Sequence, residues 1–360
     1  MTKNQELIDQ LIRDRILPQE QLIALLDTFT PVDREYAAVA ARKIAQANFG
    51  LRIYTRGLIE FSNYCKNDCY YCGIRRSNLR AERFRLSPEQ IWECCEIGYQ
   101  LGFRTFVLQS GEDIHFNDQI MVDLITEIKK NWPDCAITLS VGEKPRESYQ
   151  KYFDAGADRY LLRHETADAC HYAKLHPPEL SLRTRMQALA DLKQIGFQTG
   201  CGCMVGSPYQ TTANLAADLL FMAEFQPEMI GIGPYLPHQD TPFRDMPAGS
   251  VETTLFLLSL CRMIHPSVLL PATTALGTAR GDGRVLGVLA GANVIMPNIS
   301  PLNIRGKYLL YDHKAGINND AAESAHGLQR QMASIGYQVV VDRGDYRRDA
   351  AREDTQHENN

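Results

Sequence analysis

The sequence predicts a (β/α)8 barrel of the TIM type, with helices before it and a short extension after it. The chain has 360 residues, of which 44% are apolar and 22% are charged. That composition is typical of a globular protein with a large core, and the length accommodates a barrel of roughly 250 residues with extensions. From residue 51 onward, eight short apolar runs alternate with amphipathic helical patterns. Strands that are each followed by a helix close most economically into a barrel.

The first 50 residues predict a helical extension in front of the barrel. Leu7, Ile8 and Leu11 recur at helical spacing, and similar apolar patterns follow. Pro18 and Pro31 divide these patterns into separate helical segments. We therefore expect residues 1–50 to form helices that do not belong to the barrel itself.

The barrel strands are expected at the eight apolar runs. These runs cover residues 51–61, 105–109, 136–141, 159–162, 198–205, 229–235, 268–271 and 293–296. The helix after the first run begins with Ser87 as N-cap, Pro88 at its first position and Gln90 completing a capping box. An open doubly wound sheet is the alternative, but no GxGxxG fingerprint follows the first run.

The barrel is expected to span residues 51–312, and residues 313–360 to form a C-terminal extension. The last stretch, residues 345–360, is charged and polar. Such an end is expected to be frayed.

Composition and charge exclude several classes of protein. The formal net charge is −5, which gives no basic field for nucleic acid. Residues 1–10 are polar and charged, and no window approaches 18 uninterrupted apolar residues, so neither a signal peptide nor a membrane span is expected. These features predict a cytoplasmic protein with neither nucleic acid nor membrane as a partner. Its ten cysteines then indicate metal binding, catalysis or packing rather than a disulfide framework.

Three of these cysteines form a CxxxCxxC motif directly after the first strand. Cys65, Cys69 and Cys72 stand where a barrel places its active site, at the carboxyl end of a strand. Closely spaced thiolates in a loop can converge on one soft metal centre. A zinc ion would require a fourth ligand, and no cysteine or histidine follows at short spacing. Three ligands to a four-iron cluster would leave one iron open for binding and activation.

This motif resembles the signature of the radical SAM superfamily, which has an aromatic residue before its third cysteine, here Tyr71. The resemblance implies that the three cysteines ligate a 4Fe–4S cluster. Its open iron would chelate S-adenosylmethionine (SAM), and an electron from the cluster would cleave the sulfonium to methionine and a 5′-deoxyadenosyl radical. A zinc knuckle in a non-catalytic scaffold protein is the alternative.

Further segments are similar to the FeFe-hydrogenase maturases of the HydE family, with methylornithine synthase and, more distantly, biotin synthase as relatives. The specific segments are LLRHET at 161–166, PATTALGT at 271–278 and GANVIMPN at 291–298. The similarity covers residues 50–312. It implies a role in assembling the diiron subcluster (H-cluster) of FeFe-hydrogenase. A radical SAM amino-acid mutase, or a paralogue with another substrate, remains the alternative.

The resemblance also implies roles for individual residues. On the cofactor side it indicates Tyr71, Gln109, Ser140, Arg163, Glu165 and Arg185. On the substrate side it indicates Arg56, Arg159, Thr273, Thr274, Tyr308 and Tyr311. The arginines would suit an anionic substrate, because a buried guanidinium without a partner is costly. Each arginine has a structural alternative, which is a salt bridge lining the barrel.

The implied ligands and partners follow from the same resemblance. Residues 311–320 lack the three further cysteines that bind a second cluster in some HydE proteins, so a single cluster is expected. The substrate would be a small organometallic or amino-acid-derived molecule, and other hydrogenase maturases would be partners. The arginines at 75, 76, 80, 83 and 85 form either a solvated loop or a docking patch for an acidic ferredoxin or flavodoxin.

Cys201 and Cys203 lie two residues apart in a predicted strand, so they share one face of it. If that face is the barrel lumen, they could touch substrate. Otherwise they are small residues that make room for packing.

Overall fold

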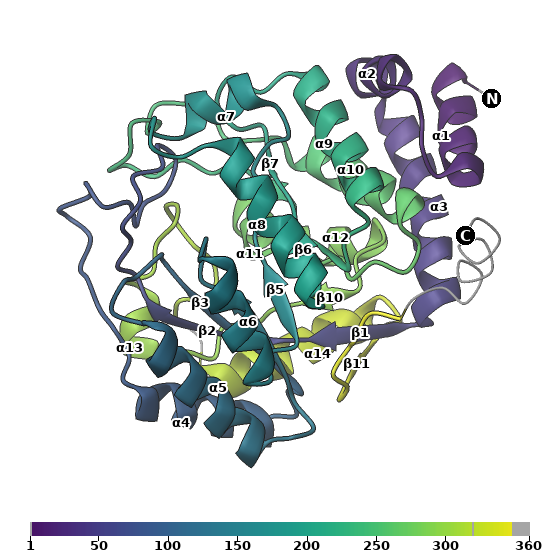
Figure 1. Ribbon diagram of the computed structural model, residues 1–360. Helices are drawn as coiled ribbons and strands as arrows, with labels where there is room; N and C mark the ends of the chain where they lie inside the picture. Colours follow the sequence, from purple (N-terminus) through teal and green to yellow (C-terminus); the bar gives the residue numbers. More distant parts are fainter. Residues whose placement is uncertain (1, 319, 348–360) are drawn as a thin grey trace, which may run out of the picture.

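The computed structural model describes residues 2–318 and 320–347 (Figure 1). Its strands are β1 (Arg52–Thr55), β2 (Gly57–Ser62), β3 (Thr105–Ser110), β4 (Ala136–Ser140), β5 (Arg159–Leu161), β6 (Gln198–Cys201), β7 (Met204–Val205), β8 (Met229–Ile230), β9 (Gly233–Pro234), β10 (Val294–Ile295) and β11 (Gln338–Val340). Its helices are α1 (Lys3–Asp14), α2 (Gln19–Thr28), α3 (Pro31–Phe49), α4 (Pro88–Gln100), α5 (Asp118–Asn131), α6 (Arg146–Asp154), α7 (Ala169–Leu175), α8 (Leu182–Ile195), α9 (Thr212–Phe225), α10 (Val251–Ile264), α11 (Thr274–Ala279), α12 (Gly283–Leu289), α13 (Leu302–Arg305) and α14 (Ala321–Ser334).

The strands close into a parallel barrel, as the sequence predicts. A six-stranded sheet runs in the order β2-β3-β4-β5-β6-β8. The ring continues from β8 through bridges Met229↔Leu269 and Pro271↔Val294 to β10, which pairs with β1. Because β1 and β2 are successive segments separated only by Arg56, this pairing returns the ring to its start. The open doubly wound alternative is thereby excluded.

Besides the first run, which forms β1 and β2, two further predicted strands are each divided in two. The run at 198–205 forms β6 and β7, and the run at 229–235 forms β8 and β9. Glycines stand at both interruptions, and a Cβ added at Gly202 would lie only 2.0 Å from the carbonyl oxygen of Gly231. The two strands therefore approach each other backbone to backbone at this level, which only glycine allows at position 202.

The N-terminal helices lie against the outer layer of barrel helices. Thr2 caps α1 and Thr30 caps α3, each through a complete capping box. Helix α3 packs on α10, and α2 packs on α9. Phe29, at the end of α2, stacks on Phe256 of α10 with ring centroids 4.3 Å apart. The apolar spacing that predicts these helices therefore marks the face that they bury.

The C-terminal extension joins the barrel at the amino end of its strands. Strand β11 pairs in parallel with β1, and in Figure 1 it lies at the end opposite the long loop that follows β2. The expectation that residues from 345 onward are frayed is wrong for Asp345 and Tyr346. Asp345 pairs with the buried Arg159, and the Tyr346 amide donates to Gln198 at 3.0 Å. Residues 348–360 lie outside the described part of the chain.

Side chains on β5 and the turn after it alternate between the lumen and the helical layer. Tyr160 and Leu162 join the core under the helices, whereas Leu161 lines a small cavity inside the barrel. With a period of two, Arg159, Arg163 and Glu165 share the side of Leu161. This strand therefore places charged residues at both ends of the lumen. Within the described residues, none of the helices combines the length and apolar character that a membrane span requires.

Candidate functional site

The predicted cysteine motif lies in a long loop between β2 and α4, at the carboxyl end of the strands (Figure 1). Cys65, Cys69 and Cys72 are all free and half-buried. The loop is held from inside by Arg83, whose guanidinium donates to backbone carbonyls of the same loop, including Ile74 at 2.8 Å and Arg75 at 2.6 Å. These bonds fix the loop without any regular secondary structure.

Two glycines let neighbouring backbone approach the cysteine loop. A Cβ at Gly111, just after β3, would lie 2.2 Å from the Tyr64 carbonyl oxygen and 2.9 Å from Cys65 Cβ. A Cβ at Gly73 would lie 2.3 Å from the Leu309 carbonyl oxygen and from the ring of His238. The loop is therefore packed against β3 on one side and against the segment after α13 on the other.

The arrangement of the three thiols fits an iron–sulfur cluster better than a zinc ion. A single tetrahedral zinc ion would hold its sulfurs about 3.8 Å apart. Among the described residues, the three possible metal-ligating atoms that all lie within 4.8 Å of one another belong to His164, Cys203 and Asp218. The sulfur atoms of the three motif cysteines do not meet this criterion, so they lie farther apart than a single zinc ion requires. A four-iron cluster gives each thiolate an iron of its own.

The environment of the three thiols disfavours uncompensated thiolates. Burial and the neighbouring thiols Cys72 and Cys65 raise the pKa of Cys69 well above its ordinary value. Burial raises the pKa of Cys72 to about 12. Backbone N–H groups of Asn67 and Glu112 donate to the Cys65 sulfur. Thiolates in this setting require the positive charge that cluster iron supplies, and the N–H donors would stabilise the ligated sulfur.

Glu165, Arg163 and Arg185 meet beside the cysteine loop. Arg163 Nη2 donates to Glu165 Oε2 at 2.9 Å, and Arg185 Nη1 donates to the Arg163 carbonyl at 2.7 Å. Arg185 Nε donates to Glu143, which leaves Nη2 for a ligand. Burial disfavours its charge, but Tyr172 and Glu143 raise the pKa of Arg185 above its usual range. The structure thus brings together the acidic and basic groups that a zwitterionic amino acid requires.

Glu165 has the backbone conformation expected of a constrained site residue. Its φ is +67°, in the left-handed region, and the residue is 7% exposed. A non-glycine residue in that region costs of order 1 kcal/mol and persists only when the surroundings enforce it.

Tyr71 lies in a chain of rings next to the cysteines. Its hydroxyl is 3.3 Å from His176 Nε2, and His176 stacks on Tyr172 with centroids 3.9 Å apart. Because His176 Nδ1 faces the Tyr172 carbonyl at 3.0 Å, Nδ1 carries the proton and Nε2 accepts from Tyr71. Burial lowers the pKa of His176 to about 3, so this imidazole stays neutral at physiological pH. Neither His176 nor Tyr172 belongs to a motif that the sequence predicts.

Gln109 and Ser140 lie side by side at the ends of β3 and β4. Gln109 Nε2 donates to the Tyr308 hydroxyl at 3.3 Å, which links the strand ends to the segment after α13. Tyr308 is buried, and burial raises its pKa well above the ordinary value.

Thr273, Thr274 and Tyr311 lie on a different part of the rim. Thr273 is the N-cap of α11 and Thr274 is its first residue. Burial raises the pKa of Tyr311 to about 12, and Arg284 faces the same hydroxyl. The Arg284 Nε is buried and has no hydrogen-bond partner. Arg284 is a site candidate that sequence reasoning missed, because only the tertiary structure brings α12 to Tyr311.

A buried ion pair holds the segment that carries the two tyrosines. Lys314 Nζ contacts Glu60 Oε1 and donates to the Tyr308 carbonyl at 3.0 Å. Both side chains are almost fully buried. Asn298 donates to the other Glu60 oxygen at 2.7 Å. Lys314 was not predicted, and the 254 residues that separate it from Glu60 carry no local signal of the pairing.

Arg56 lies deeper in the lumen. Its Nη1 faces Met229 Sδ at 2.9 Å, whereas Nε and Nη2 have no hydrogen-bond partner. The surrounding cavity has a volume of about 10 Å³, close to the lower limit for one water molecule. Burial and the nearby Arg159 charge lower the pKa of Arg56 well below its usual range.

The expected substrate role of Arg159 is wrong. Its guanidinium lies at the amino end of the barrel and donates to Thr105 Oγ1 at 2.9 Å, to Gln198, and to the C-terminal residues Arg343 and Asp345. Every side of the group is satisfied by protein, and it is fully buried. The structural alternative therefore holds, with Asp345 as the partner.

The structure also shows the surroundings of Cys201, Cys203 and the loop arginines. Cys201 and Cys203 belong to the core under the helices rather than to the lumen, which favours packing over substrate contact. Of the loop arginines, Arg75 and Arg85 form bidentate pairs with Asp68 and Asp113. The side chains of Arg76 and Arg80 are 61% and 84% exposed.

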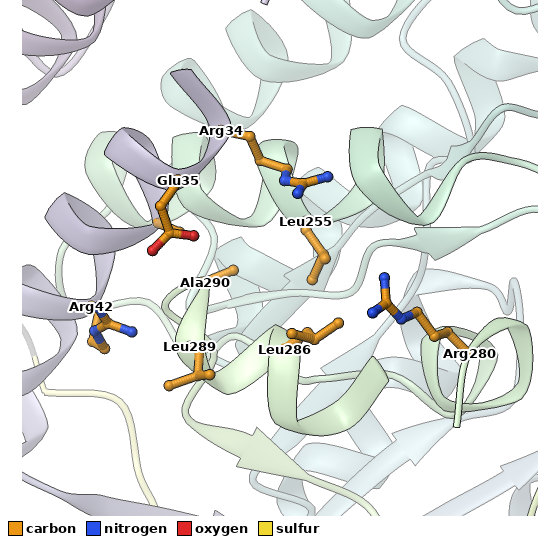
Figure 2. A pocket seen from close by; sticks show the side chains of 9 residues that line it. Arg34, Glu35, Arg42, Leu255, Arg280, Leu286, Leu289 and Ala290 are labelled. Atoms are coloured by element: carbon orange, nitrogen blue, oxygen red, sulfur yellow. The ribbon is translucent and has the colours of Figure 1, made fainter. Parts of the chain in front are cut away.

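A separate pocket of about 160 Å³ lies on the outside of the barrel, where α3 faces α10 and α12 (Figure 2). Leu255 and Ala290 are part of its apolar floor, and arginines and Glu35 form its rim. Arg280 on this rim pairs with Asp282 at 2.7 Å. None of the predicted site residues line this pocket, so it is distinct from the candidate site.

Three comparisons with known proteins agree with this geometry. The model of the radical SAM superfamily matches residues 59–222. The FeFe-hydrogenase maturase subunit HydE of Thermotoga maritima is 46% identical over 274 residues, which cover 76% of this chain and 78% of that protein. Among solved structures, methylornithine synthase (PylB) is similar with a TM-score of 0.78 at 26% identity, covering 93% of this chain and 97% of that one. The hydrogenase maturase HydG has the same fold, with a TM-score of 0.78 at 21% identity over 94% of this chain and 76% of that one.

Proposed function

The chain belongs to the radical SAM superfamily, and we propose that it is an FeFe-hydrogenase maturase of the HydE type that uses SAM in assembly of the diiron subcluster. The observation that carries the proposal is the 46% identity to a HydE protein over three quarters of the chain, together with a cysteine loop at the carboxyl end of a closed barrel. Enzymes of this superfamily use a 4Fe–4S cluster and SAM.

Cys65, Cys69 and Cys72 are proposed as the cluster ligands. When bound, the cluster supplies the electron that cleaves SAM to methionine and a 5′-deoxyadenosyl radical. Three cysteine ligands would leave one iron of a four-iron cluster free to bind SAM.

Glu165 and Arg185 are proposed to orient SAM. The Glu165 carboxylate suits the methionyl ammonium or a ribose hydroxyl. Arg185 offers Nη2 to the methionyl carboxylate, while Glu143 and the Arg163 carbonyl fix the other nitrogens of its guanidinium. Tyr71, Gln109, Ser140 and Arg163 are proposed as further neighbours of the cofactor.

The substrate is proposed to lie below SAM, among residues that line the rim and lumen. Thr273, Thr274, Tyr308 and Tyr311 would contact it, and Arg284 joins this group. Burial raises the pKa of the Tyr308 and Tyr311 hydroxyls. Both hydroxyls therefore stay protonated and act as neutral hydrogen-bond donors. Arg56 has two unpartnered nitrogens beside a cavity that holds no more than about one water molecule, so it would attract the anionic end of a small organometallic or amino-acid-derived substrate through its charge rather than by direct contact.

The exposed tip of the cysteine loop is proposed to receive the electron donor. The exposed side chain of Arg76 pairs with the exposed Glu179 at 3.8 Å, and that of Arg80 pairs at 2.9 Å with Asp240, whose side chain is 14% exposed. Leu79 between them is 94% exposed. Exposed ion pairs contribute little and can exchange partners, so an acidic ferredoxin or flavodoxin could replace Glu179 and Asp240. Other hydrogenase maturases would deliver the substrate and take the product.

A maturation experiment tests the function. The protein with reconstituted cluster should restore FeFe-hydrogenase activity to an extract that contains the other maturases but lacks its own HydE. The alternative, an amino-acid mutase like methylornithine synthase, is supported by the similarity to PylB over 93% of the chain. It predicts SAM cleavage stimulated by a basic amino acid and no maturation. Absence of both activities, with a cluster in place, would contradict the assignment.

A further inference from the structure

A buried polar network lies behind the end of β5, on the side that faces the helices. His164 stands between the inward-facing Arg163 and Glu165, and its side chain is completely buried. Its Nε2 is 3.3 Å from Asp218 Oδ1 on α9, and its Nδ1 is 3.2 Å from the Gly202 amide. The edge of Phe221 packs against the imidazole at 4.7 Å between centroids. The function proposed above assigns no role to this histidine.

The network is not arranged as a metal site, although the donor atoms of His164, Cys203 and Asp218 lie within 4.8 Å of one another. The Gly202 amide can only donate, so Nδ1 accepts and the proton sits on Nε2, where it points to Asp218. A metal on Nε2 would move that proton to Nδ1 and set it against the Gly202 N–H. The imidazole therefore has one tautomer and both nitrogens are occupied.

The same atoms fix the backbone around Glu165. The Glu165 amide donates to the Gly202 carbonyl at 3.0 Å, so the Gly202 peptide groups are held by His164 on one side and by Glu165 on the other. Asp218 Oδ1 also accepts from the Ala167 amide at 2.6 Å. The turn that carries Glu165 is thus tied at both ends to one carboxylate of α9.

Burying the carboxylate of Asp218 costs free energy that packing of α9 alone would not require. It is 1% exposed, and its Oδ2 is buried without a hydrogen-bond partner. An apolar residue of similar size would fill the same space without burying a charge. The left-handed φ of Glu165 is the feature nearby that requires such support.

We propose that His164 and Asp218 are positioning residues, which hold Glu165 and Arg163 toward SAM through a histidine of fixed tautomer. This rests on the proposed function, because the group that they position is the proposed SAM contact. Neither side chain touches the cofactor. Their removal should weaken SAM binding while the cluster, held by a different loop, is retained.

Four variants separate positioning from packing. His164→Phe and Asp218→Leu keep the bulk and remove the hydrogen bonds. His164→Asn keeps an acceptor for the Gly202 amide, and Asp218→Asn keeps an oxygen for the Ala167 amide. His265→Phe is the control, because His265 is a buried histidine at the C-terminal end of α10, and its Nε2 is 2.8 Å from the carbonyl of Met222 on α9.

SAM affinity is measured from the change that SAM causes in the electron paramagnetic resonance spectrum of the reduced cluster, with iron content and thermal unfolding measured in parallel. His164→Phe and Asp218→Leu should raise the dissociation constant of SAM about tenfold at unchanged iron content. The asparagine variants should restore most of the affinity. His265→Phe should lower the unfolding temperature and leave SAM affinity unchanged.

Two results would overturn the proposal. The first is wild-type SAM affinity in His164→Phe and Asp218→Leu together with a lowered unfolding temperature, which would make the network purely structural. The second comes from ¹⁵N-histidine NMR of the metal-free protein, if the His164 signal shows a proton on Nδ1. Failure of the wild-type protein itself to bind SAM, with its cluster present, would instead reject the proposed function, and the positioning role with it.

Discussion

The two ends of the barrel carry similar charged residues, but these residues differ in how completely they are hydrogen-bonded. At the amino end, Arg159 donates to Thr105, to Gln198 and to the C-terminal residues around Asp345. At the carboxyl end, Arg163 leaves a buried Nε without a partner, and Glu165 adopts a left-handed backbone. Arg159 begins β5, and Arg163 lies on the same side four residues later, in the turn that follows the strand.

The difference separates stability from chemistry within one strand. A guanidinium whose donors all meet protein can only support the fold. A guanidinium with an open donor beside a strained carboxylate is prepared for a ligand, at some cost in stability. Barrels place their chemistry at the carboxyl end of the strands, and this chain follows that division through its hydrogen bonds.

The largest effect is expected at the cysteine loop. Cys69→Ala should reduce SAM cleavage to the background of the assay, because the cluster would lose one of its three proposed ligands. Formation of 5′-deoxyadenosine and iron content report this directly. Cys94→Ala, which removes a buried thiol from α4, is the matched control and should cost about 1 kcal/mol of stability without loss of iron. Retention of full activity in Cys69→Ala would remove these cysteines from the site.

A paired substitution on β5 contrasts the two ends. Arg159→Met should lower the free energy of unfolding by about 3 kcal/mol, because it removes a fully buried guanidinium together with its hydrogen bonds to Thr105, Gln198 and the C-terminal segment, while KM for SAM stays the same. Arg163→Met should do the reverse, with a raised KM and a smaller loss of stability. Denaturant unfolding and SAM-cleavage kinetics are the measurements. Equal effects of the two variants on KM would mean that both ends of the lumen contact ligand.

Arg185 provides a graded test of the SAM site. Arg185→Met should raise KM for SAM between about 10-fold and 100-fold, because a charged hydrogen bond contributes roughly 1.5–3 kcal/mol. Arg185→Lys keeps the charge but loses the fork, so its effect should be intermediate. An unchanged KM in Arg185→Met would show that this residue serves Glu143 alone.

The amino end should also have a pH signature. Burial opposes the charge of Asp345, but the hydrogen bond from Arg343 and the Arg159 charge lower its pKa to about 2, from an ordinary value of 3.8. Because the pKa of Asp345 is lower in the folded than in the unfolded protein, its ionised carboxylate stabilises the fold at any pH above 3.8. That stability is lost as the pH falls toward 2. Because the side chain is 35% exposed, the contribution is about 1 kcal/mol after solvent screening. The stability difference between wild type and Asp345→Asn should therefore shrink between pH 4 and pH 2 in denaturant titrations.

The smallest effect is expected at the exposed tip of the cysteine loop. Reversing Arg76 and Arg80 to Glu should slow reduction by an acidic flavodoxin about fivefold at low salt and not at high salt. Reduction by dithionite should not change. The same reversal at Arg34 and Arg42, which border the outer pocket (Figure 2), is the control. A salt-independent rate would exclude this surface as the docking site.

Local sequence patterns determined a large share of this structure. The alternation of apolar runs and helical stripes predicted the barrel, and caps such as Ser87 mark helix starts as expected. The cysteine loop was also predictable, since its three thiols lie within eight residues of one another. Glu165 and Arg185 were found through resemblance, and the structure brings them beside that loop. Each of these signals is carried by neighbours in the chain.

The partners of the charged side chains were decided only by the tertiary structure. Asp345 reaches Arg159 across 186 residues and Lys314 reaches Glu60 across 254, and nothing in either local sequence announces the other. Arg56 has open nitrogens only because barrel closure surrounds it with Met229 and other apolar groups. Residue type and spacing determine which groups are available and which face of an element they share. Whether a buried charge is satisfied or left open depends on which distant segments the closed barrel brings against it.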